Sequence, residues 1–435
     1  MKMKLMIVLF VCFTMTVGFA NDEGRQLFER YLDAFLSGKY EMAIEYQNEQ
    51  LTAAFSVESM KQSADVIVSQ YGKPETVYST ELVEQGEYKS YIRIMKTTQG
   101  YIKFTVTVDK NLKIAGFYAT PVPDPRKTLS DLDKKAFEEH SITFGKKGWE
   151  LDGVLTLPKN QESYPIMIIV GGSGPTDMDG TVGPNTPYKD IAEGLASSGV
   201  SVMRYNKRSA QHGLKINEVT DEIENMVDFE YVEDVNLAIE YAASIDNVNG
   251  IILAGHSLGG TVVPKIATCS ERVDGLILLA PGVRRLAQIS MDQNRYVKDH
   301  FGISDEQIKQ VEQLFTKIMN HELTEDFQIQ AGLTARYYYE MDEYAPLEDL
   351  SQFEKPVLVL QGEEDFQTTM EGDFLPLKEK YDEQEHFTFI SFPALNHLFM
   401  KTEEGIFHWT DEYNTPGFVD ETVIKTISEW IQMHY

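Results

Sequence analysis

The serine best placed to do chemistry lies between glycines. Gly255-His256-Ser257-Leu258-Gly259 matches the pattern G-x-S-x-G, directly after an apolar run at 251–254 and directly before a helical stretch. This strand–turn–helix setting holds a serine on a tight, strained turn with its hydroxyl exposed above a sheet. Glycines suit both sides because a Cβ there would clash with the adjacent strand or helix. Ser257 is therefore predicted to be a nucleophile. The structural alternative is a serine that only caps the helix.

A base and an acid should follow this serine along the chain. A serine hydroxyl is a weak nucleophile until a base removes its proton. Apolar runs at 357–360 and 387–392 lead into Asp365 and His397, respectively. We expect Asp365 to orient His397, and His397 to act first as general base and then as general acid. Glu364 is the alternative acid, and a surface histidine without a catalytic role is the alternative for His397.

Backbone donors should stabilise the negative oxygen that forms when such a serine attacks a carbonyl. One is expected to be the N–H of Leu258, directly after the serine. The other should come from Gly171-Gly172-Ser173-Gly174-Pro175, which follows an apolar run at 166–170. Ser173 is the predicted second donor, with Gly172 as the next choice. A phosphate-binding loop is the alternative, but G-x-G-x-x-G spacing and a Walker lysine are both missing.

The elements that must position these residues form a repeating pattern. Apolar runs alternate with helical stretches, and most of the runs are apolar on both faces, as strands of a covered parallel sheet must be. The expected strands are 166–170, 200–205, 251–254, 276–280, 357–360 and 387–392, and the expected helices are 188–198, 228–245, 258–270 and 418–433. The sequence therefore predicts an α/β class with a mostly parallel sheet and helices on both faces.

A second, smaller body precedes this pattern. Residues 25–47 have helical spacing, and Ile102, Phe104, Val106 and Val108 alternate with polar residues before a turn at 109–111. The sequence thus predicts an N-terminal α+β domain over 22–120. Three prolines in the five residues 121–125 suit an extended linker over 121–135, with the catalytic domain at 136–435.

The chain resembles the α/β-hydrolases, specifically secreted bacterial esterase-type serine hydrolases with an N-terminal domain of unknown function. The stretches that carry the resemblance are 171–180, 204–208, 255–260, 362–365 and 395–399. It implies hydrolysis of a small-molecule carboxylic ester without a cofactor. Related groups include thioesterases and serine peptidases. The family usually has aspartate where Asn206 stands and a Gly-rich turn in place of 209–211.

The insertion between Pro281 and Pro356 occupies the position where such hydrolases carry a helical cap, at about 282–355. Ser304 and Gln307 form a predicted capping box, and apolar residues follow at helical spacing. Tyr337 and Tyr338 are candidates for lining a substrate pocket. Core packing between cap helices is the alternative for both tyrosines.

The net charge and the N-terminal residues indicate which partners and which compartment to expect. The 435 residues carry 39 Lys plus Arg against 68 Asp plus Glu, a net charge of −29, which disfavours nucleic acid and anionic lipid. Residues 1–20 combine lysines, an apolar stretch and the small residues Gly18 and Ala20, the pattern of a secretory signal peptide. The protein is therefore expected to be secreted or extracytoplasmic, with no other membrane segment. An uncleaved N-terminal anchor is the alternative.

Cysteine and metal chemistry are not expected. Signal removal leaves Cys269 as the one cysteine, so no intrachain disulfide can form. We expect Cys269 to pack as a small apolar group on a helix. No H-E-x-x-H motif or Cys cluster indicates a metal.

Three functional hypotheses remain open at this point. The first is a secreted serine esterase that forms an acyl-enzyme on Ser257. The second is a serine peptidase of the aminopeptidase type, or a thioesterase, that uses the same three residues. The third is a surface-binding module in which the N-terminal domain binds a ligand and the hydrolase is vestigial.

Overall fold

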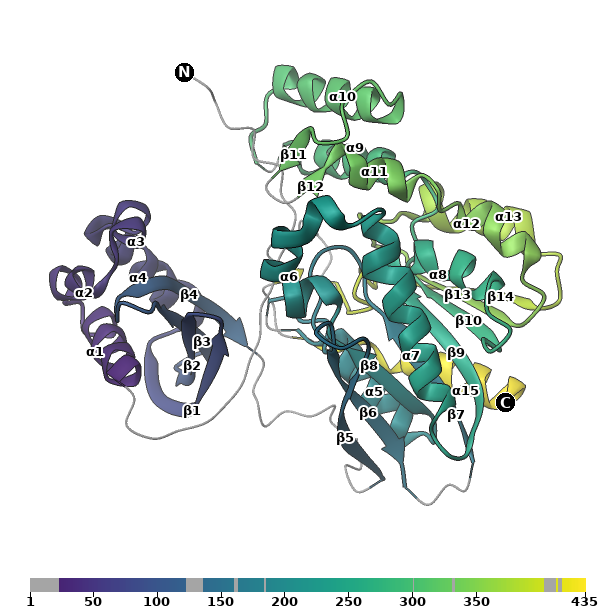
Figure 1. The fold of residues 1–435 in the computed structure, drawn as a ribbon, viewed down its shortest axis with the longest axis horizontal. Helices are drawn as coiled ribbons and strands as arrows, with labels where there is room; N and C mark the ends of the chain where they lie inside the picture. The colour runs from purple at the N-terminus through teal and green to yellow at the C-terminus, as the bar shows by residue number, and fades with distance from the viewer. Residues whose placement is uncertain are drawn as a thin grey trace.

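The computed structural model of the chain describes residues 23–122, 136–159, 163–183, 185–299, 301–330, 333–402, 412–413 and 417–435. The described residues form a small body with an antiparallel sheet and a larger one with a mixed sheet (Figure 1). The predicted signal peptide at 1–20 and most of the predicted linker lie outside these residues.

The N-terminal body combines helices with an antiparallel meander. Its elements are α1 (Glu23–Leu36), α2 (Tyr40–Tyr46), α3 (Glu49–Ala54), α4 (Val57–Tyr71), β1 (Pro74–Gln85), β2 (Tyr88–Thr97), β3 (Tyr101–Val108) and β4 (Ile114–Val122). Helices α3 and α4 were not predicted. Each begins at a polar cap, because the side chains of Asn48 and Ser56 accept hydrogen bonds from the N–H groups of Leu51 and Ser59.

The alternating pattern in β3 has the predicted effect. Its four apolar residues, from Ile102 to Val108, are buried in one core with helix residues such as Phe28 and Tyr31. The turn after β3 is closed by Asp109, whose side chain accepts hydrogen bonds from the N–H groups of Asn111 and Lys113. β4 continues through Pro121 to Val122, so the strand ends two residues later than the predicted domain boundary. Pro121 is tolerated there because β4 is an edge strand.

The larger body is built on an eight-stranded sheet of order β14-β13-β10-β9-β7-β8-β6-β5. Its strands are β5 (Phe137–Phe144), β6 (Leu151–Pro158), β7 (Tyr164–Val170), β8 (Ser201–Tyr205), β9 (Val248–His256), β10 (Gly275–Leu279), β13 (Val357–Gly362) and β14 (Phe387–Phe392). The six strands from β14 to β8 are parallel, and β6 and β5 extend the sheet in antiparallel pairing. All six predicted strands are present.

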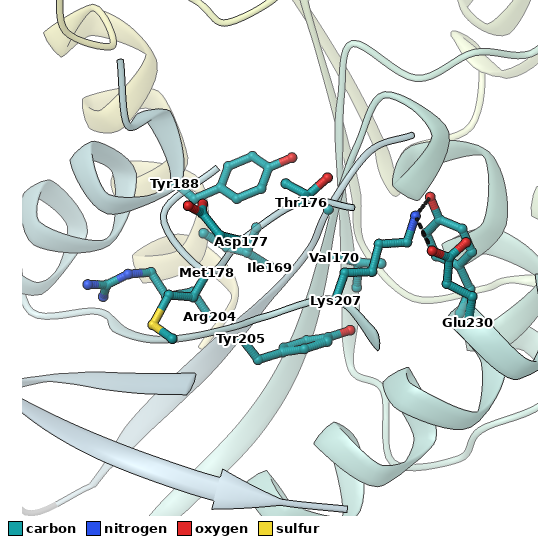
Figure 2. Close-up of a pocket in the computed structure, with 12 residues that line it drawn as sticks. Ile169, Val170, Thr176, Asp177, Met178, Tyr188, Arg204, Tyr205, Lys207 and Glu230 are labelled. Atoms are coloured by element: carbon teal, nitrogen blue, oxygen red, sulfur yellow. Dashed lines mark hydrogen bonds and ion pairs between the residues drawn. The ribbon is translucent and has the colours of Figure 1, made fainter. Parts of the chain in front are cut away.

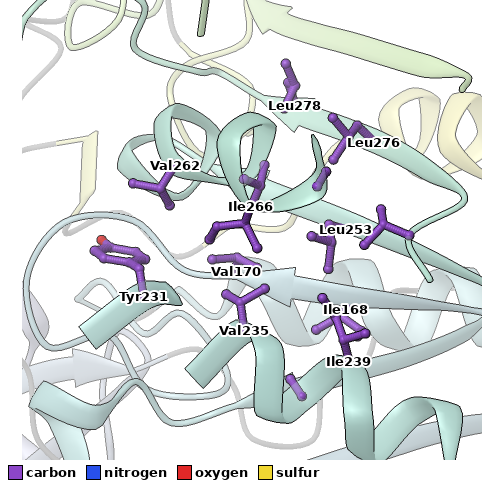
Figure 3. Packing of buried hydrophobic residues seen from close by; sticks show 14 of the residues in the cluster. Ile168, Val170, Tyr231, Val235, Ile239, Leu253, Val262, Ile266, Leu276 and Leu278 are labelled. Carbon is purple, nitrogen blue, oxygen red and sulfur yellow. The ribbon is translucent and has the colours of Figure 1, made fainter. Parts of the chain in front are cut away.

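Both faces of this sheet are covered. Along β7, Ile166, Ile168 and Val170 belong to one hydrophobic core, whereas Met167 and Ile169 belong to the other. Figure 3 shows the first core, in which strand residues pack against residues of α7 (Glu233–Ala243) and α8 (Leu258–Thr268). The second core includes residues of α5 (Pro187–Ser197) and α15 (Glu421–His434). Each helix of the four corresponds to a predicted one.

Further helices connect these strands. They are α6 (Arg208–Val219), the 3-10 turn Thr220–Glu222, the π-helical turns Asp228–Val232 and Met370–Phe374, and α13 (Leu375–Tyr381). The segment between β10 and β13 contains α9 (Leu286–Val297), α10 (Asp305–Met319), β11 (Gln328–Gln330), β12 (Leu333–Thr334), α11 (Ala335–Met341), α12 (Pro346–Asp349) and the 3-10 turn Leu350–Gln352.

The segment inserted between β10 and β13 folds largely as its local sequence patterns predict. The hydroxyl of Ser304 accepts a hydrogen bond from the Gln307 N–H, and the Gln307 side chain accepts one from the Ser304 N–H, so the predicted capping box is present. The four apolar residues that follow at helical spacing are buried. Cys269 differs from its prediction. It is the C-terminal cap of α8, directly after the last helical residue, and is exposed instead of packed in the core.

Candidate active site

Ser257 lies on a strained turn between β9 and α8. Its backbone has φ 55° and ψ −121°, a left-handed conformation that non-glycine residues adopt at a cost of about 1–3 kcal/mol. The neighbouring glycines make the turn possible. A Cβ at Gly255 would lie 2.5 Å from the carbonyl oxygen of Gly259, and a Cβ at Gly259 would lie 2.3 Å from that of Val170. This geometry is that of a nucleophile elbow rather than of a simple helix cap.

His397 and Asp365 meet through a direct hydrogen bond. Nδ1 of His397 lies 2.6 Å from Oδ2 of Asp365, and both side chains are buried. Burial alone would raise the pKa of Asp365. The facing His397 and the hydrogen bonds from Gln367 and Thr368 outweigh it, so the pKa of Asp365 lies below its ordinary value. The carboxylate that meets the imidazole is thus that of Asp365 and not that of Glu364.

The histidine segment lies directly against the elbow. Nε2 of His256, the residue before the serine, lies 2.9 Å from the main-chain oxygen of His397. The two imidazole rings have centroids 4.7 Å apart. Among the described residues, the Ser257 hydroxyl makes no hydrogen bond with the His397 ring. Such contacts are often long before substrate binds, so the third link of the triad belongs to the proposal below.

The glycine loop after β7 lies beside the nucleophile. A Cβ added to Gly172 would lie 3.1 Å from Cβ and 3.6 Å from Oγ of Ser257, so the main chain approaches closely here. The Gly172 N–H donates a hydrogen bond to the Tyr188 hydroxyl over 3.2 Å. That bond occupies its hydrogen, which argues against Gly172 as the alternative oxyanion donor. Ser173 is the better candidate. Leu258 opens α8, and the N–H groups of a first helical turn have no acceptor within the helix.

A buried lysine anchors this loop from below. Nζ of Lys207 donates to the carbonyl oxygens of Gly172 and Gly174, each over 3.1 Å, and to the Tyr231 hydroxyl over 2.6 Å. It also forms an ion pair with Glu230 at 3.3 Å. Burial lowers the pKa of Lys207, and Glu230 opposes that shift. Figure 2 shows Lys207 and Glu230 facing each other at a small cavity under the loop. Its volume is about 10 Å³.

Comparison with known proteins identifies the family of the larger body. A family described as serine aminopeptidase, S33, matches residues 180–404, just over half of the chain. The chain belongs to this family. Residues 29–117 match a family described as a protein of unknown function (DUF3887). The chain is also 31% identical to "Esterase EstD" of Thermotoga maritima over 430 residues, which is 99% of this chain and 100% of that protein.

Solved structures include several similar hydrolases. Est1E from Butyrivibrio proteoclasticus has a TM-score of 0.44 at 19% identity and covers 68% of this chain and 98% of its own. An esterase from Pyrococcus furiosus has a TM-score of 0.42 at 12% identity and covers 72% and 97%. With the S33 match and the sheet topology, the predicted α/β-hydrolase fold with an extra N-terminal domain is confirmed. The chain is an α/β-hydrolase of the esterase type.

The two tyrosines predicted near substrate have different surroundings. Tyr338 is buried at 2% exposure and packs on Phe315 with ring centroids 5.8 Å apart, which matches the packing alternative. The Tyr337 hydroxyl lies 3.4 Å from Oε2 of Glu230, the partner of Lys207. Tyr337 therefore contacts Glu230, which supports the glycine loop through Lys207. A role of either tyrosine in binding substrate stays a prediction.

Several residues of this S33-family site were not foreseen. Lys207, Glu230 and Tyr231 support the glycine loop, and Tyr188 and His256 join it to the histidine segment. One available signal was a lysine two residues after a buried strand, where burial of a charge demands partners. Asn206, where the family usually has aspartate, accepts a hydrogen bond from the Met178 N–H over 2.9 Å.

The described ranges offer neither a metal site nor a helix that could span a membrane. No group of three or more His, Cys, Asp or Glu side chains in those ranges is arranged to hold a metal ion. The helices of the same ranges include none with the length and apolar character of a membrane span.

Proposed function

We propose that the protein is a serine esterase that cleaves small-molecule carboxylic esters through an acyl-enzyme on Ser257. The observation that carries this is the 2.6 Å hydrogen bond between Asp365 and His397, beside a serine whose backbone is strained at φ 55°. A buried carboxylate with a lowered pKa keeps its charge and favours the imidazolium that forms during catalysis.

The reaction then proceeds in two halves. The Ser257 oxygen attacks the ester carbonyl carbon while His397 takes the hydroxyl proton. The C–O bond to the alcohol breaks, and His397 returns the proton to the departing alkoxide. In the second half, water attacks the acyl carbon, its proton passes through His397 to Ser257, and the carboxylic acid leaves. The N–H groups of Leu258 and Ser173 donate hydrogen bonds to the oxyanion in both halves.

The name "Esterase EstD" of the relative that matches along its whole length supports an ester substrate. The family description, serine aminopeptidase, supports peptide cleavage as the second candidate. Ester cleavage and peptide cleavage would use the same acyl-enzyme chemistry and differ in the leaving group. Para-nitrophenyl esters of graded acyl length, compared with the matching para-nitroanilides, separate the two. We expect esters to be cleaved at least about 100-fold faster.

The Ser257→Ala variant tests the proposed nucleophile. Loss of the hydroxyl should reduce ester turnover by about 10⁴-fold or more, because no acyl-enzyme can form. Thermal unfolding of the same variant checks that the fold persists. Turnover by Ser257→Ala at the rate of the unaltered protein would exclude the proposal.

We also propose that residues 1–20 direct export of the enzyme. This proposal rests on the lysines, the apolar stretch and the small residues Gly18 and Ala20. N-terminal sequencing of the protein recovered outside the cytoplasm should begin directly after Ala20. Recovery of the whole chain, with Met1 retained, in the cytoplasmic fraction would contradict it.

A further inference from the structure

We propose that Tyr188 and His256 are positioning residues that form a hydrogen-bonded bridge between the oxyanion loop and the catalytic histidine segment. The bridge rests on the proposed function, since it assigns roles to residues around the same serine. Tyr188 lies in the first turn of α5, and His256 is the last residue of β9. Neither side chain has a part in the proton transfers described above.

Three contacts in series make the bridge. The Gly172 N–H donates to the Tyr188 hydroxyl over 3.2 Å. The same hydroxyl lies 2.9 Å from Nδ1 of His256. Nε2 of His256 lies 2.9 Å from the main-chain oxygen of His397. The bridge therefore joins residues that are far apart in the sequence and belong to the two loops that must meet at Ser257.

The direction of each hydrogen bond follows from the partners. A carbonyl oxygen can only accept, so Nε2 of His256 must carry the hydrogen that points at His397. The tyrosine oxygen accepts from Gly172, so its own hydrogen is free to be donated to Nδ1 of His256. This pattern needs a neutral imidazole. Burial, and then the nearby His397, lower the pKa of His256 to about 3, so the ring stays neutral at working pH.

The bridge fixes one of the two peptide groups around Gly172, and the lysine network fixes the other. Tyr188 holds the N–H of Gly172, in the peptide group before the residue. Lys207 and Tyr231 hold its carbonyl oxygen, in the peptide group that also contains the Ser173 N–H. In a trans peptide the C=O and N–H point in opposite directions. Lys207 and Tyr231 bind the Gly172 carbonyl on the side of the small cavity beside Lys207. The Ser173 N–H therefore points to the opposite side, away from that cavity.

At its other end, the bridge holds His397 without using its ring. Nδ1 of that ring binds Asp365, so the Nε2 side remains available to the serine. The bridge reaches the segment through the main-chain oxygen instead. All three residues of the bridge region are closely confined, because Tyr188, His256 and His397 are each less than one-tenth exposed. A shift of about 1 Å in such a site costs roughly 100-fold in rate.

The Tyr188→Phe variant tests the bridge, with Tyr381→Phe as its matched control. Tyr381 is also buried, and its hydroxyl also donates a hydrogen bond, to the Leu347 carbonyl in a different part of the body. Three quantities are measured on a para-nitrophenyl ester: kcat, KM and the affinity for a trifluoromethyl ketone, which forms a tetrahedral adduct with the serine. Thermal unfolding reports any general loss of stability.

We expect Tyr188→Phe to lower kcat and the ketone affinity together by about 10- to 100-fold, with KM changed by less than about 2-fold. Tyr381→Phe should leave all three kinetic quantities unchanged. A Tyr188→Phe variant with unchanged ketone affinity, or with effects equal to those of Tyr381→Phe, overturns the bridge. If that result comes with an inactive Ser257→Ala, the proposed function still stands. An active Ser257→Ala defeats the function itself.

The His256→Gln variant provides a second test of the bridge and, should Tyr188→Phe fold poorly, is expected on its own to lower kcat and the ketone affinity together. Glutamine keeps an N–H that can reach the His397 carbonyl oxygen, but its acceptor is an amide oxygen on a flexible chain instead of a ring nitrogen held at the position of Nδ1. If one bridge acts as a unit, the double variant should lose about as much kcat as the worse single variant. Independent packing effects would instead multiply, and that outcome would also overturn the bridge.

Discussion

Asp365 and Asp190 are both buried aspartates of the hydrolase body, yet their pKa values shift in opposite directions. The pKa of Asp365 is lowered because His397 and several donors outweigh its burial. Burial raises the pKa of Asp190 to about 7, because its compensation comes chiefly from the Val419 N–H and Glu193 lies nearby. The carboxylate of Asp365 is suited to orienting a base. The carboxyl group of Asp190 instead stabilises the fold when it is protonated, so its contribution is largest at low pH.

Asp190 should make the protein less stable as the pH rises. Its pKa is about 7 when folded and near 3.8 when unfolded. The folded state then binds more protons between these values, so this group's stabilisation is complete near pH 4 and is lost as the pH rises through 7. The effect is on the order of a few kcal/mol. Asp190→Asn, which keeps an acceptor for Val419, should raise the melting temperature more at pH 8 than at pH 5.

Asp299→Asn is the control for Asp190→Asn. Its side chain is 98% exposed, and the substitution removes the same formal charge. Thermal unfolding at both pH values compares the two variants. An equal pH response in both would show that net charge, rather than the buried site, accounts for the effect.

At the scale of residues, the sequence could predict side chains that follow strands but not the ones that support them. Ser257, Asp365 and His397 each come soon after an apolar run, and strand ends of a parallel sheet meet at one edge. Tyr188 and His256 are 68 positions apart, and His256 and His397 are 141 apart. Such pairs have no local pattern, because only the packed fold determines which buried donor meets which acceptor.

Among the elements, the elbow depends on glycines at positions with no room for a side chain. A Cβ at Gly259 would lie 2.3 Å from the Val170 oxygen and 2.7 Å from that of Gly171, both main-chain atoms. Main-chain atoms of a central strand can move little. The lack of a side chain at Gly259 therefore allows the helix that carries Leu258 to pack closely against β7.

Gly259→Ala should destabilise the protein by at least about 2 kcal/mol, because the added methyl group clashes with β7. Gly213→Ala is its matched control. Gly213 lies in α6 with nothing within 4 Å of an added Cβ. That variant should gain about 0.5–1 kcal/mol from helix propensity. Denaturant unfolding of both variants measures the difference. A Gly259→Ala variant as stable as Gly213→Ala would contradict the packing described here.

The elements that were predicted and those that were missed differ in burial. Strands β7, β9, β10 and β13 are buried on both faces and give continuous apolar runs. Strand β5 is mostly exposed, and it lies at the sheet edge. Its sequence therefore shows no run that separates it from a loop. Helix α6 is largely polar and contains a non-helical residue at His212, so its periodicity is weak.

At the scale of the whole molecule, the described residues form separate hydrophobic cores. One core draws only on residues of the N-terminal body, and the others draw only on residues of the hydrolase body. The net charge of −29 favours solubility and disfavours polyanionic partners for either body. Composition supports these two expectations, on solubility and on polyanionic partners. It carries no information on the role of the N-terminal body.

Separate cores should allow the two bodies to unfold independently. A trifluoromethyl ketone at about 100 times its dissociation constant should stabilise the hydrolase body by about 2.7 kcal/mol, or roughly 5–10 °C in melting temperature. Hydrogen exchange read on peptides from 23–122 should not change. Ser257→Ala, which cannot form the adduct, is the control. Equal protection of both bodies would show that they unfold as one unit.

The most direct test of the central claim is to locate the covalent adduct of a fluorophosphonate probe by mass spectrometry of peptides. A nucleophilic Ser257 predicts one adduct per chain, on the peptide that contains this serine, and no adduct there in Ser257→Ala. It also predicts that His397→Ala reacts at least about 100-fold more slowly, because the hydroxyl then lacks its base. An adduct on another residue, or equal labelling of the His397→Ala variant, would contradict the account.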